Sequence, residues 1–285
     1  MRMTMKCSYK KISALILALM MLLSVTGCTD NSASSLPGEK PSVYPFVNTL
    51  KEPDDNAMQA VEAPELTEQV KQKAEEVNRE IVGWLQVPGT DINQPVVQAT
   101  NNSKYLRLNY EGKYSFQGCY WVDYECKVGT RETQSRNTII YGHNTAVSQD
   151  DPNGLDFAQL LRFTDEEFAA SHPYIFFSTG EEDMVWEIFA VMYTDTKFRY
   201  IEMIDNQIDT LVSEGKARSE FLYDVEVDPI NDKILTLSTC TAKYGYVGGE
   251  ARGRFVVMAR LVDADQELKP TAGLEKNASI KAPQF

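Results

Sequence analysis

Short stretches in which apolar and polar residues alternate recur along the middle of the chain, and they predict a protein built mainly from β-strands. Each stretch is rich in β-branched or aromatic residues and is bounded by turn formers such as Gly and Pro. Ahead of a final pair near the C-terminal end, the stretches cover residues 83–87, 92–98, 118–124, 138–141, 174–177 and 184–193. Many short strands with few helices favour a closed or nearly closed β-barrel with helices at its periphery.

Apolar residues spaced three and four apart predict two helices, and a capping pattern predicts a third. The first helix runs from Leu66 to Ile81, and we expect one of its faces to pack on the domain. The second covers residues 204–212 and is expected to stop near Gly215. Between them, Thr164 and Glu167 have the spacing of a capping box, which predicts a short helix opened by Thr164.

The two ends of the chain lack this periodicity. Residues 28–65 are rich in Ser, Pro, Asp and Asn, and we expect a flexible tether there. Residues 263–285 are polar and contain Pro, so we expect this tail to contribute little to the core. One folded domain is therefore assigned to residues 66–262.

Residues 1–27 have the order of an export signal, with basic residues, then an apolar run from Ile12 to Leu23, then small residues. The apolar run is shorter than the roughly 20 residues that a membrane-spanning helix needs, which favours cleavage. The segment from Val25 to Cys28 also resembles a bacterial lipobox, which implies lipid attachment at Cys28 and cleavage just before it. The alternative is an uncleaved transmembrane anchor. Both place the domain at the outer face of the cytoplasmic membrane.

Composition excludes some functions. The chain has 28 Lys and Arg against 41 Asp and Glu, a net charge of −13, which repels phosphate backbones and excludes nucleic acid as a partner. Five cysteines are present, but none has CxxC or zinc-site spacing, so no metal or other cofactor is expected. Cys119 and Cys126 lie in one strand-like run, and a disulfide between them requires a bend in that run.

The last pair of strand-like segments carries the candidate chemistry. Residues 234–240 alternate so that Cys240 ends the strand, on the face opposite Leu235 and Leu237. A loop over residues 241–253 contains several glycines, and a second strand begins at Arg254, which antiparallel pairing would place beside Cys240. Because a free thiol has a pKa of about 8.5 and is mostly protonated at neutral pH, a nucleophilic cysteine requires a basic partner.

The chain contains only two histidines that can fill this role. His143 follows an apolar strand that ends before Gly142, whereas His172 precedes Pro173, which favours an extended connection. We therefore assign His143 as the proton-transfer partner of Cys240 and expect a structural role for His172.

Taken together, these features resemble the sortase family. The resemblance rests on Thr-Leu-Ser-Thr-Cys at residues 236–240, on Arg254 at the head of the next strand and on the upstream strand-terminal His143. Residues 137–144 and the run from Ile81 to Thr90 are similar to class B sortases in particular. The similarity covers about Leu66 to Val262. It implies a closed β-barrel of about eight strands with an N-terminal helix and peripheral helices.

The resemblance also implies residue roles. Cys240 would be the nucleophile, His143 the general acid and base, and Arg254 the cation that stabilises the oxyanion or holds the substrate carbonyl. Arg252 lies two residues earlier with the same strand parity, but Arg254 directly adjoins the apolar strand. Ser238 and Thr239 are substrate-contact candidates. The sequence assigns no Asp or Glu as a third member of the catalytic set.

A sortase would cut the C-terminal sorting motif of a surface protein after Thr. It would then pass the thioester to an amine of the cell wall precursor or of a pilin. Two alternatives remain open. One is a cell-wall cysteine endopeptidase that uses water in place of the amine, and the other is a lipid-anchored binding barrel in which Cys240 is a small buried residue.

Overall fold

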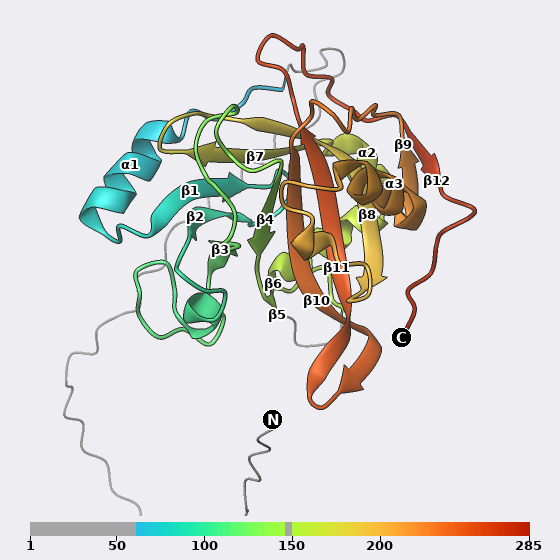
Figure 1. Ribbon diagram of the computed structural model, residues 1–285, viewed down its shortest axis with the longest axis horizontal. Helices are drawn as coiled ribbons and strands as arrows, with labels where there is room; N and C mark the ends of the chain where they lie inside the picture. Colours follow the sequence, from blue (N-terminus) through green and yellow to red (C-terminus); the bar gives the residue numbers. More distant parts are fainter. Residues whose placement is uncertain (1–60, 146–149) are drawn as a thin grey trace, which may run out of the picture. The chain divides into compact units, whose positions relative to one another are not determined.

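The computed structural model describes residues 61–145 and 150–285, and its strands close into a barrel (Figure 1). Eight strands form the barrel in the order β1-β2-β3-β4-β10-β11-β8-β7, which confirms the predicted fold class. Their bounds are β1 (Ile81–Gln86), β2 (Asn93–Val97), β3 (Tyr120–Val122), β4 (Asn137–Tyr141), β7 (Tyr174–Thr179), β8 (Val185–Asp195), β10 (Ile234–Val247) and β11 (Glu250–Leu261).

Helices and two small sheets surround the barrel. The α-helices are α1 (Thr67–Glu76), α2 (Glu166–Ser171) and α3 (Ile208–Arg218), and the 3₁₀ helices are η1 (Lys104–Arg107), η2 (Phe157–Thr164) and η3 (Tyr200–Glu202). The small sheets pair β5 (Asn144–Thr145) with β6 (Leu155–Asp156) and β9 (Phe221–Tyr223) with β12 (Leu274–Lys276). No α-helix in these two described ranges is long and apolar enough to span a bilayer.

The pairing of β4 with β10 determines where the site lies. These strands run parallel although almost a hundred residues separate them, with Ile234 opposite Asn137 and Ser238 opposite Tyr141. The other neighbour of β10 is β11, which pairs antiparallel and brings Cys240 opposite Arg254, as predicted. Strand β10 therefore lies between the strand that leads to His143 and the strand that carries Arg254.

Alternation along β10 separates the core from the site. Leu235 and Leu237 are fully buried in the main hydrophobic cluster of the barrel, whereas Cys240 is exposed at the rim. Thr236 is also buried, and its hydroxyl donates a hydrogen bond to Asn137 Oδ1 (2.7 Å). A polar residue is tolerated at this buried position because its hydrogen-bonding capacity is used.

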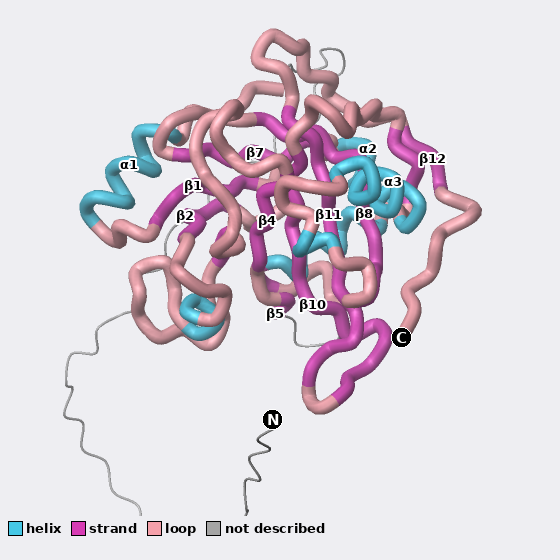
Figure 2. Tube along the Cα trace, in the orientation of Figure 1, coloured by secondary structure: helices cyan, strands magenta, loops and turns pink. Residues whose placement is uncertain are grey.

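The loop expected over residues 241–253 is wrong, because most of these residues belong to two strands. Strands β10 and β11 continue beyond Cys240 as a hairpin that projects past the barrel (Figure 2). Its turn is at Gly248 and Gly249, whose positive φ angles of 62° and 88° suit residues without a side chain. The glycines therefore mark one tight turn and irregularities in a hairpin, where a long loop was expected.

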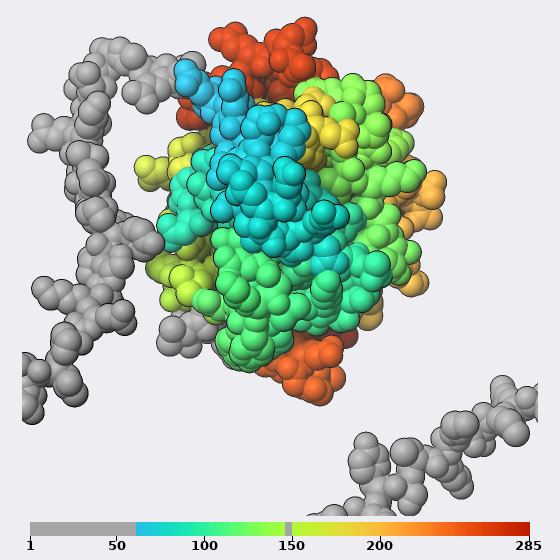
Figure 3. Space-filling view, turned by 90° about the vertical axis from the view of Figure 1, so that its left-hand side faces the viewer, coloured from blue at the N-terminus to red at the C-terminus, as the bar shows by residue number. Residues whose placement is uncertain are grey.

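The helix boundaries also differ from expectation. Helix α1 ends at Glu76, and Ile81 already belongs to β1; Figure 3 shows α1, in cyan, lying across one face of the domain. Helix α3 continues through Gly215, where a Cβ would lie 2.9 Å from Met258 Sδ, so this Gly permits close packing and does not end the helix. The cap of α2 is Asp165, which accepts from Phe168 N, and Thr164 is not the cap.

The tail beyond residue 262 adds no buried apolar side chain to the core, as expected, but it is docked on the domain. Its strand β12 pairs with β9. Asn277 is buried, and its Nδ2 donates to the carbonyl of Ser219 (2.8 Å). Cys119 and Cys126 are both buried free thiols, so no disulfide joins them. The assigned signal peptide, Cys28 and most of the tether lie outside the described residues and stay predictions.

Candidate active site

The ends of β4 and β10 bring two catalytic candidates to one edge of the barrel. The hydroxyl of Thr239 donates to the carbonyl of Gly142 (2.7 Å), and Asn144 Nδ2 donates to the carbonyl of Cys240 (3.0 Å). These bonds tie the residues on either side of His143 to the end of β10. Gly142 is required here, because a Cβ would lie 2.7 Å from the ring of Phe157.

His143 is oriented by contacts on one side of its ring. Its Nε2 lies 3.0 Å from the carbonyl oxygen of Leu106, which can only accept, so Nε2 carries the donated proton. The ring also lies 5.8 Å from the ring of Trp121, centroid to centroid. Nδ1 is consequently the nitrogen available for proton exchange in the cavity.

Arg254 reaches the same cavity from the other side of β10. Its Nη1 donates to the carbonyl oxygens of Ala251 and Gly253, each at 2.9 Å. These two bonds fix the guanidinium on its own strand, and its remaining N–H groups are available for a ligand. The Cα of Arg254 is the cross-strand partner of the Cα of Cys240.

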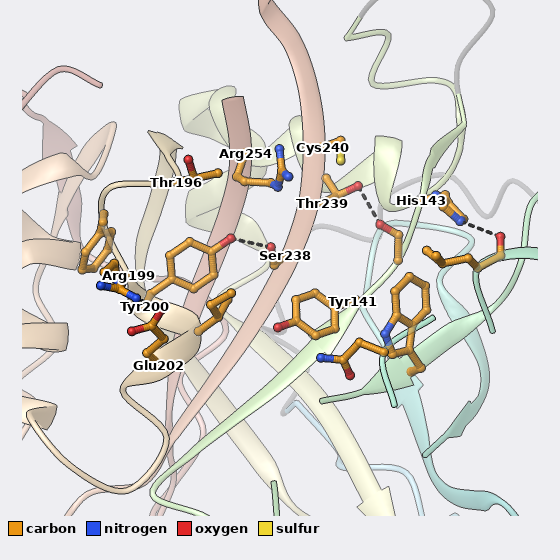
Figure 4. Close-up of a pocket in the computed structure, with 16 residues that line it drawn as sticks. Tyr141, His143, Thr196, Arg199, Tyr200, Glu202, Ser238, Thr239, Cys240 and Arg254 are labelled. Carbon is orange, nitrogen blue, oxygen red and sulfur yellow. Dashed lines mark hydrogen bonds and ion pairs between the residues drawn. The ribbon is translucent and has the colours of Figure 1, made fainter. Parts of the chain in front are cut away.

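One cavity of about 340 Å³ connects these side chains (Figure 4). All five residues that the sequence nominated for the site line it, namely His143, Ser238, Thr239, Cys240 and Arg254. Its remaining lining residues are Asn102, Leu106, Trp121, Tyr141, Gly142, Thr196, Phe198, Arg199, Tyr200, Ile201 and Glu202. Cys240 is exposed, so its thiol is accessible from solvent where it lines the cavity.

A hydrogen bond between Ser238 and Tyr200 forms part of the cavity wall. Their hydroxyl oxygens lie 2.7 Å apart, and both residues are buried. Burial raises the pKa of Tyr200 to about 12, although the Ser238 hydrogen bond and the charge of Arg254 act in the opposite direction. Tyr200 is therefore a neutral phenol at physiological pH.

The rejected candidates lie away from the cavity. His172 stacks on Phe168 with ring centroids 4.1 Å apart, and its Nδ1 is 2.9 Å from the carbonyl oxygen of Phe168. Arg252 places its guanidinium 4.7 Å from the centroid of the Phe285 ring. Within the described ranges, no cluster of three or more His, Cys, Asp or Glu side chains suits a metal ion.

Sequence reasoning missed most of the cavity wall. Residues 196–202, which connect β8 to α3, supply one side of it, and Asn102 and Leu106 supply part of the other. Neither segment has helix or strand periodicity. The one available signal was the concentration of apolar and aromatic residues at 198–204 in the connection between the two elements.

Comparisons with known proteins agree with this geometry. A family model described as a sortase domain matches residues 85–262. The chain is 34% identical over 191 residues to Sortase B of Listeria monocytogenes, covering 66% of this chain and 72% of that protein.

Solved structures give the same result. The Staphylococcus aureus sortase B–substrate complex has a TM-score of 0.59 at 27% identity, covering 70% of this chain and 87% of that one. A sortase B complexed with triglycine has a TM-score of 0.59 at 28% identity, covering 70% and 88%. The chain therefore belongs to the sortase family of cysteine transpeptidases, and within that family to class B.

Proposed function

We propose that this protein cleaves the C-terminal sorting motif of a surface protein after Thr and transfers the acyl group to a primary amine. The observation that carries the proposal is the single cavity that Cys240, His143 and Arg254 share. The similar structures support it, because one was solved with a substrate and another with triglycine, a peptide that has a free amino group. The amine would belong to a cell wall precursor or to a pilin.

In the first step, the thiolate of Cys240 attacks the carbonyl carbon of the scissile peptide bond. An S–C bond forms, the C–N bond breaks, and protonated His143 gives its proton to the leaving amine. Arg254 offsets the negative charge that develops on the carbonyl oxygen, and its tethered guanidinium needs little reorganisation to do so. The products are a thioester on Cys240 and a released peptide.

In the second step, an amine resolves the thioester. Its nitrogen attacks the carbonyl carbon, a C–N bond forms, and the C–S bond breaks. The proton that the amine loses goes to His143, which restores the thiolate and the imidazolium pair. Ser238 and Thr239 would lie along the bound motif, although the hydroxyl of Thr239 is already used by Gly142.

We also propose that the domain works at the outer face of the cytoplasmic membrane, held by lipid on Cys28. This placement is supported by the order of basic, apolar and small residues before Cys28. It would bring the cavity close to both membrane-bound reactants, which are the protein to be sorted and the amine acceptor.

The test uses full-length protein in detergent with peptides of the Asn-Pro-x-Thr-Asn and Pro-x-Thr-Gly types. We expect cleavage after Thr, and a Thr-amide product when triglycine is added. Cys240→Ala and His143→Ala should each remove nearly all turnover, whereas His172→Ala, a control histidine outside the cavity, should retain it. Cleavage by the Cys240→Ala variant would overturn the proposal, and a product that is always the free acid would favour the endopeptidase.

A further inference from the structure

Backbone pairing between β4 and β10 ends before it reaches the two catalytic candidates. Its last pair joins Tyr141 to Ser238, and a hydrogen bond from Gly142 N to the carbonyl of Ser238 (3.3 Å) follows. His143 and Cys240 each lie two residues beyond that pair. Other contacts must therefore hold the end of β10 that carries the thiol against the segment that carries the imidazole.

A buried threonine directly after Cys240 binds a carboxylate from another segment. Thr241 is fully buried, and it is the last residue of β10 that pairs with β11 before the register shifts. Its hydroxyl donates to the carboxylate of Asp150, whose Oδ1 and Oδ2 lie 2.8 and 2.7 Å away. Ala242 N also donates to Asp150 Oδ1 (3.3 Å). One carboxylate therefore binds both residues that directly follow Cys240.

The same carboxylate reaches the residue that follows His143. Asn144 Nδ2 lies 3.4 Å from Asp150 Oδ1, and it also donates to the carbonyl of Cys240 at 3.0 Å. Figure 1 shows β5, which begins with Asn144, beside the end of β10. Hydrogen bonds to an ionised carboxylate are about twice as strong as those between neutral groups. Asp150 therefore joins the segment after the thiol to the segment after the imidazole.

The backbone of Asp150 is unusual in a way that fits this contact. Its φ angle is 56°, in the left-handed region that few residues other than Gly, Asn and Asp adopt. Such a conformation costs free energy and persists where the surrounding structure determines it. Here the hydrogen bonds of the carboxylate to Thr241 and Ala242 supply that constraint.

We infer that Asp150 is a positioning residue for the thiol of Cys240 and the imidazole of His143. The inference rests on the proposed function, in which these two groups act on the same peptide bond. Asp150 acts through Thr241 and Asn144, and none of these three residues lines the cavity. Because a misplacement of about 1 Å can lower a rate about 100-fold, loss of these bonds should slow the chemical steps and leave binding of the sorting motif little changed.

The experiment compares kcat and KM for cleavage of the sorting peptide by full-length protein. Thr241→Val removes the hydroxyl and keeps a side chain of similar volume. We expect it to lower kcat about tenfold to 100-fold while KM changes less than about threefold. Thr241→Ser keeps the hydroxyl, so its kcat should stay within about threefold of that of the unsubstituted protein. Thermal melting confirms that each variant is folded at the assay temperature, so a lower kcat reports the geometry of the catalytic pair.

A second variant tests the carboxylate itself. Asp150→Gly removes the side chain and suits the positive φ angle, and it should lower kcat as much as Thr241→Val does. The double variant should be no more than about threefold slower than either single variant, because both remove the same hydrogen bond. Asp151→Gly is the matched control. The Asp151 carboxylate accepts from Asn153 N (2.9 Å) and forms no hydrogen bond to β10 in the described ranges, so kcat should stay within about twofold.

Several results would overturn the inference alone. One is a folded Thr241→Val protein whose kcat is within about twofold of normal, and another is a rise in KM at unchanged kcat. Losses that multiply in the double variant, or an equal loss in Asp151→Gly, would also overturn it. If the unsubstituted protein cleaves neither peptide, the proposed function fails and the inference falls with it.

Discussion

Arg254 offers the sharpest test of how the cavity stabilises charge. Its Nη1 is held by two carbonyl oxygens at 2.9 Å, so the cation is already fixed before a substrate binds. A fixed donor aimed at a developing oxyanion is worth about 2.7 to 4 kcal/mol of transition-state stabilisation. Arg254→Ala should therefore lower kcat/KM about 100-fold to 1000-fold.

A lysine variant separates the contribution of the guanidinium's donor geometry from the contribution of its positive charge. Arg254→Lys keeps the positive charge but not the planar fork of donors, so we expect its activity to lie between those of the unsubstituted protein and Arg254→Ala. Arg252→Ala is the control, since the Arg252 guanidinium stacks on Phe285 and lies outside the cavity.

The assay is initial-rate cleavage of the sorting peptide, followed by chromatography and mass spectrometry, with thermal melting to confirm that each variant is folded. A folded Arg254→Ala protein within about threefold of normal kcat/KM would refute the assigned role, because the loss of an oxyanion donor has a much larger effect. An equal loss in Arg252→Ala would also refute it, by showing that the effect is not specific to the cavity.

Other expected outcomes concern the thiols, the N-terminus and the tail. In native protein at pH 9, iodoacetamide should modify Cys240 and spare Cys119 and Cys126, because burial raises the pKa of Cys119 and of Cys126 to about 12; equal labelling of all three would contradict this. Unfolded thiols titrate near pH 8.5, so the folded state retains protons that the unfolded state releases, and the melting temperature should fall as pH rises from about 8.5 toward 12. Intact-mass measurement of membrane-extracted protein should show a lipid-bearing N-terminus at Cys28, and a chain retaining its first residue would exclude it. Asn277→Ala should lower the free energy of unfolding in urea by about 1 to 3 kcal/mol, since it leaves a buried carbonyl without its donor, and no change would mean that the tail is not docked.

Local signals were sufficient for the barrel strands and for nominating three residues that share one cavity, Cys240, His143 and Arg254. Alternation along residues 234–240 identified the face of Cys240, and antiparallel pairing with the next strand then placed Arg254 opposite. His143 was found because a polar, titratable residue directly follows an apolar strand at a Gly. These inferences succeed because strand period and strand order are properties of neighbouring residues.

Long-range contacts account for what the sequence did not predict. Gly215 lies inside helix α3 beside Met258, where a Cβ would come within 2.9 Å of the sulfur, and nothing near Gly215 in the sequence indicates this partner. The bond between Tyr200 and Ser238 joins positions far apart in the chain. Strand β12 has no hydrophobic period of its own and forms because β9 offers a free edge. Composition therefore indicated that the tail adds little to the core, but it did not indicate the pairing of β12 with β9.

Consecutive residues in and just after strand β4 have different roles, because the first ones lie in the core and the next ones line the cavity. Ile139 and Ile140 are fully buried in the core, so substitutions there should act mainly through stability. The next residues have different environments: Tyr141 lines the cavity, Gly142 has no room for a side chain, and His143 lines the cavity that the thiol shares. In the parallel partner β10, Ser238 lies opposite Tyr141, and Cys240 and His143 each follow two residues later. Any shift in the β4–β10 register would therefore separate His143 from the thiol. The buried pairing of these two strands thus keeps both members of the proposed catalytic pair in one cavity.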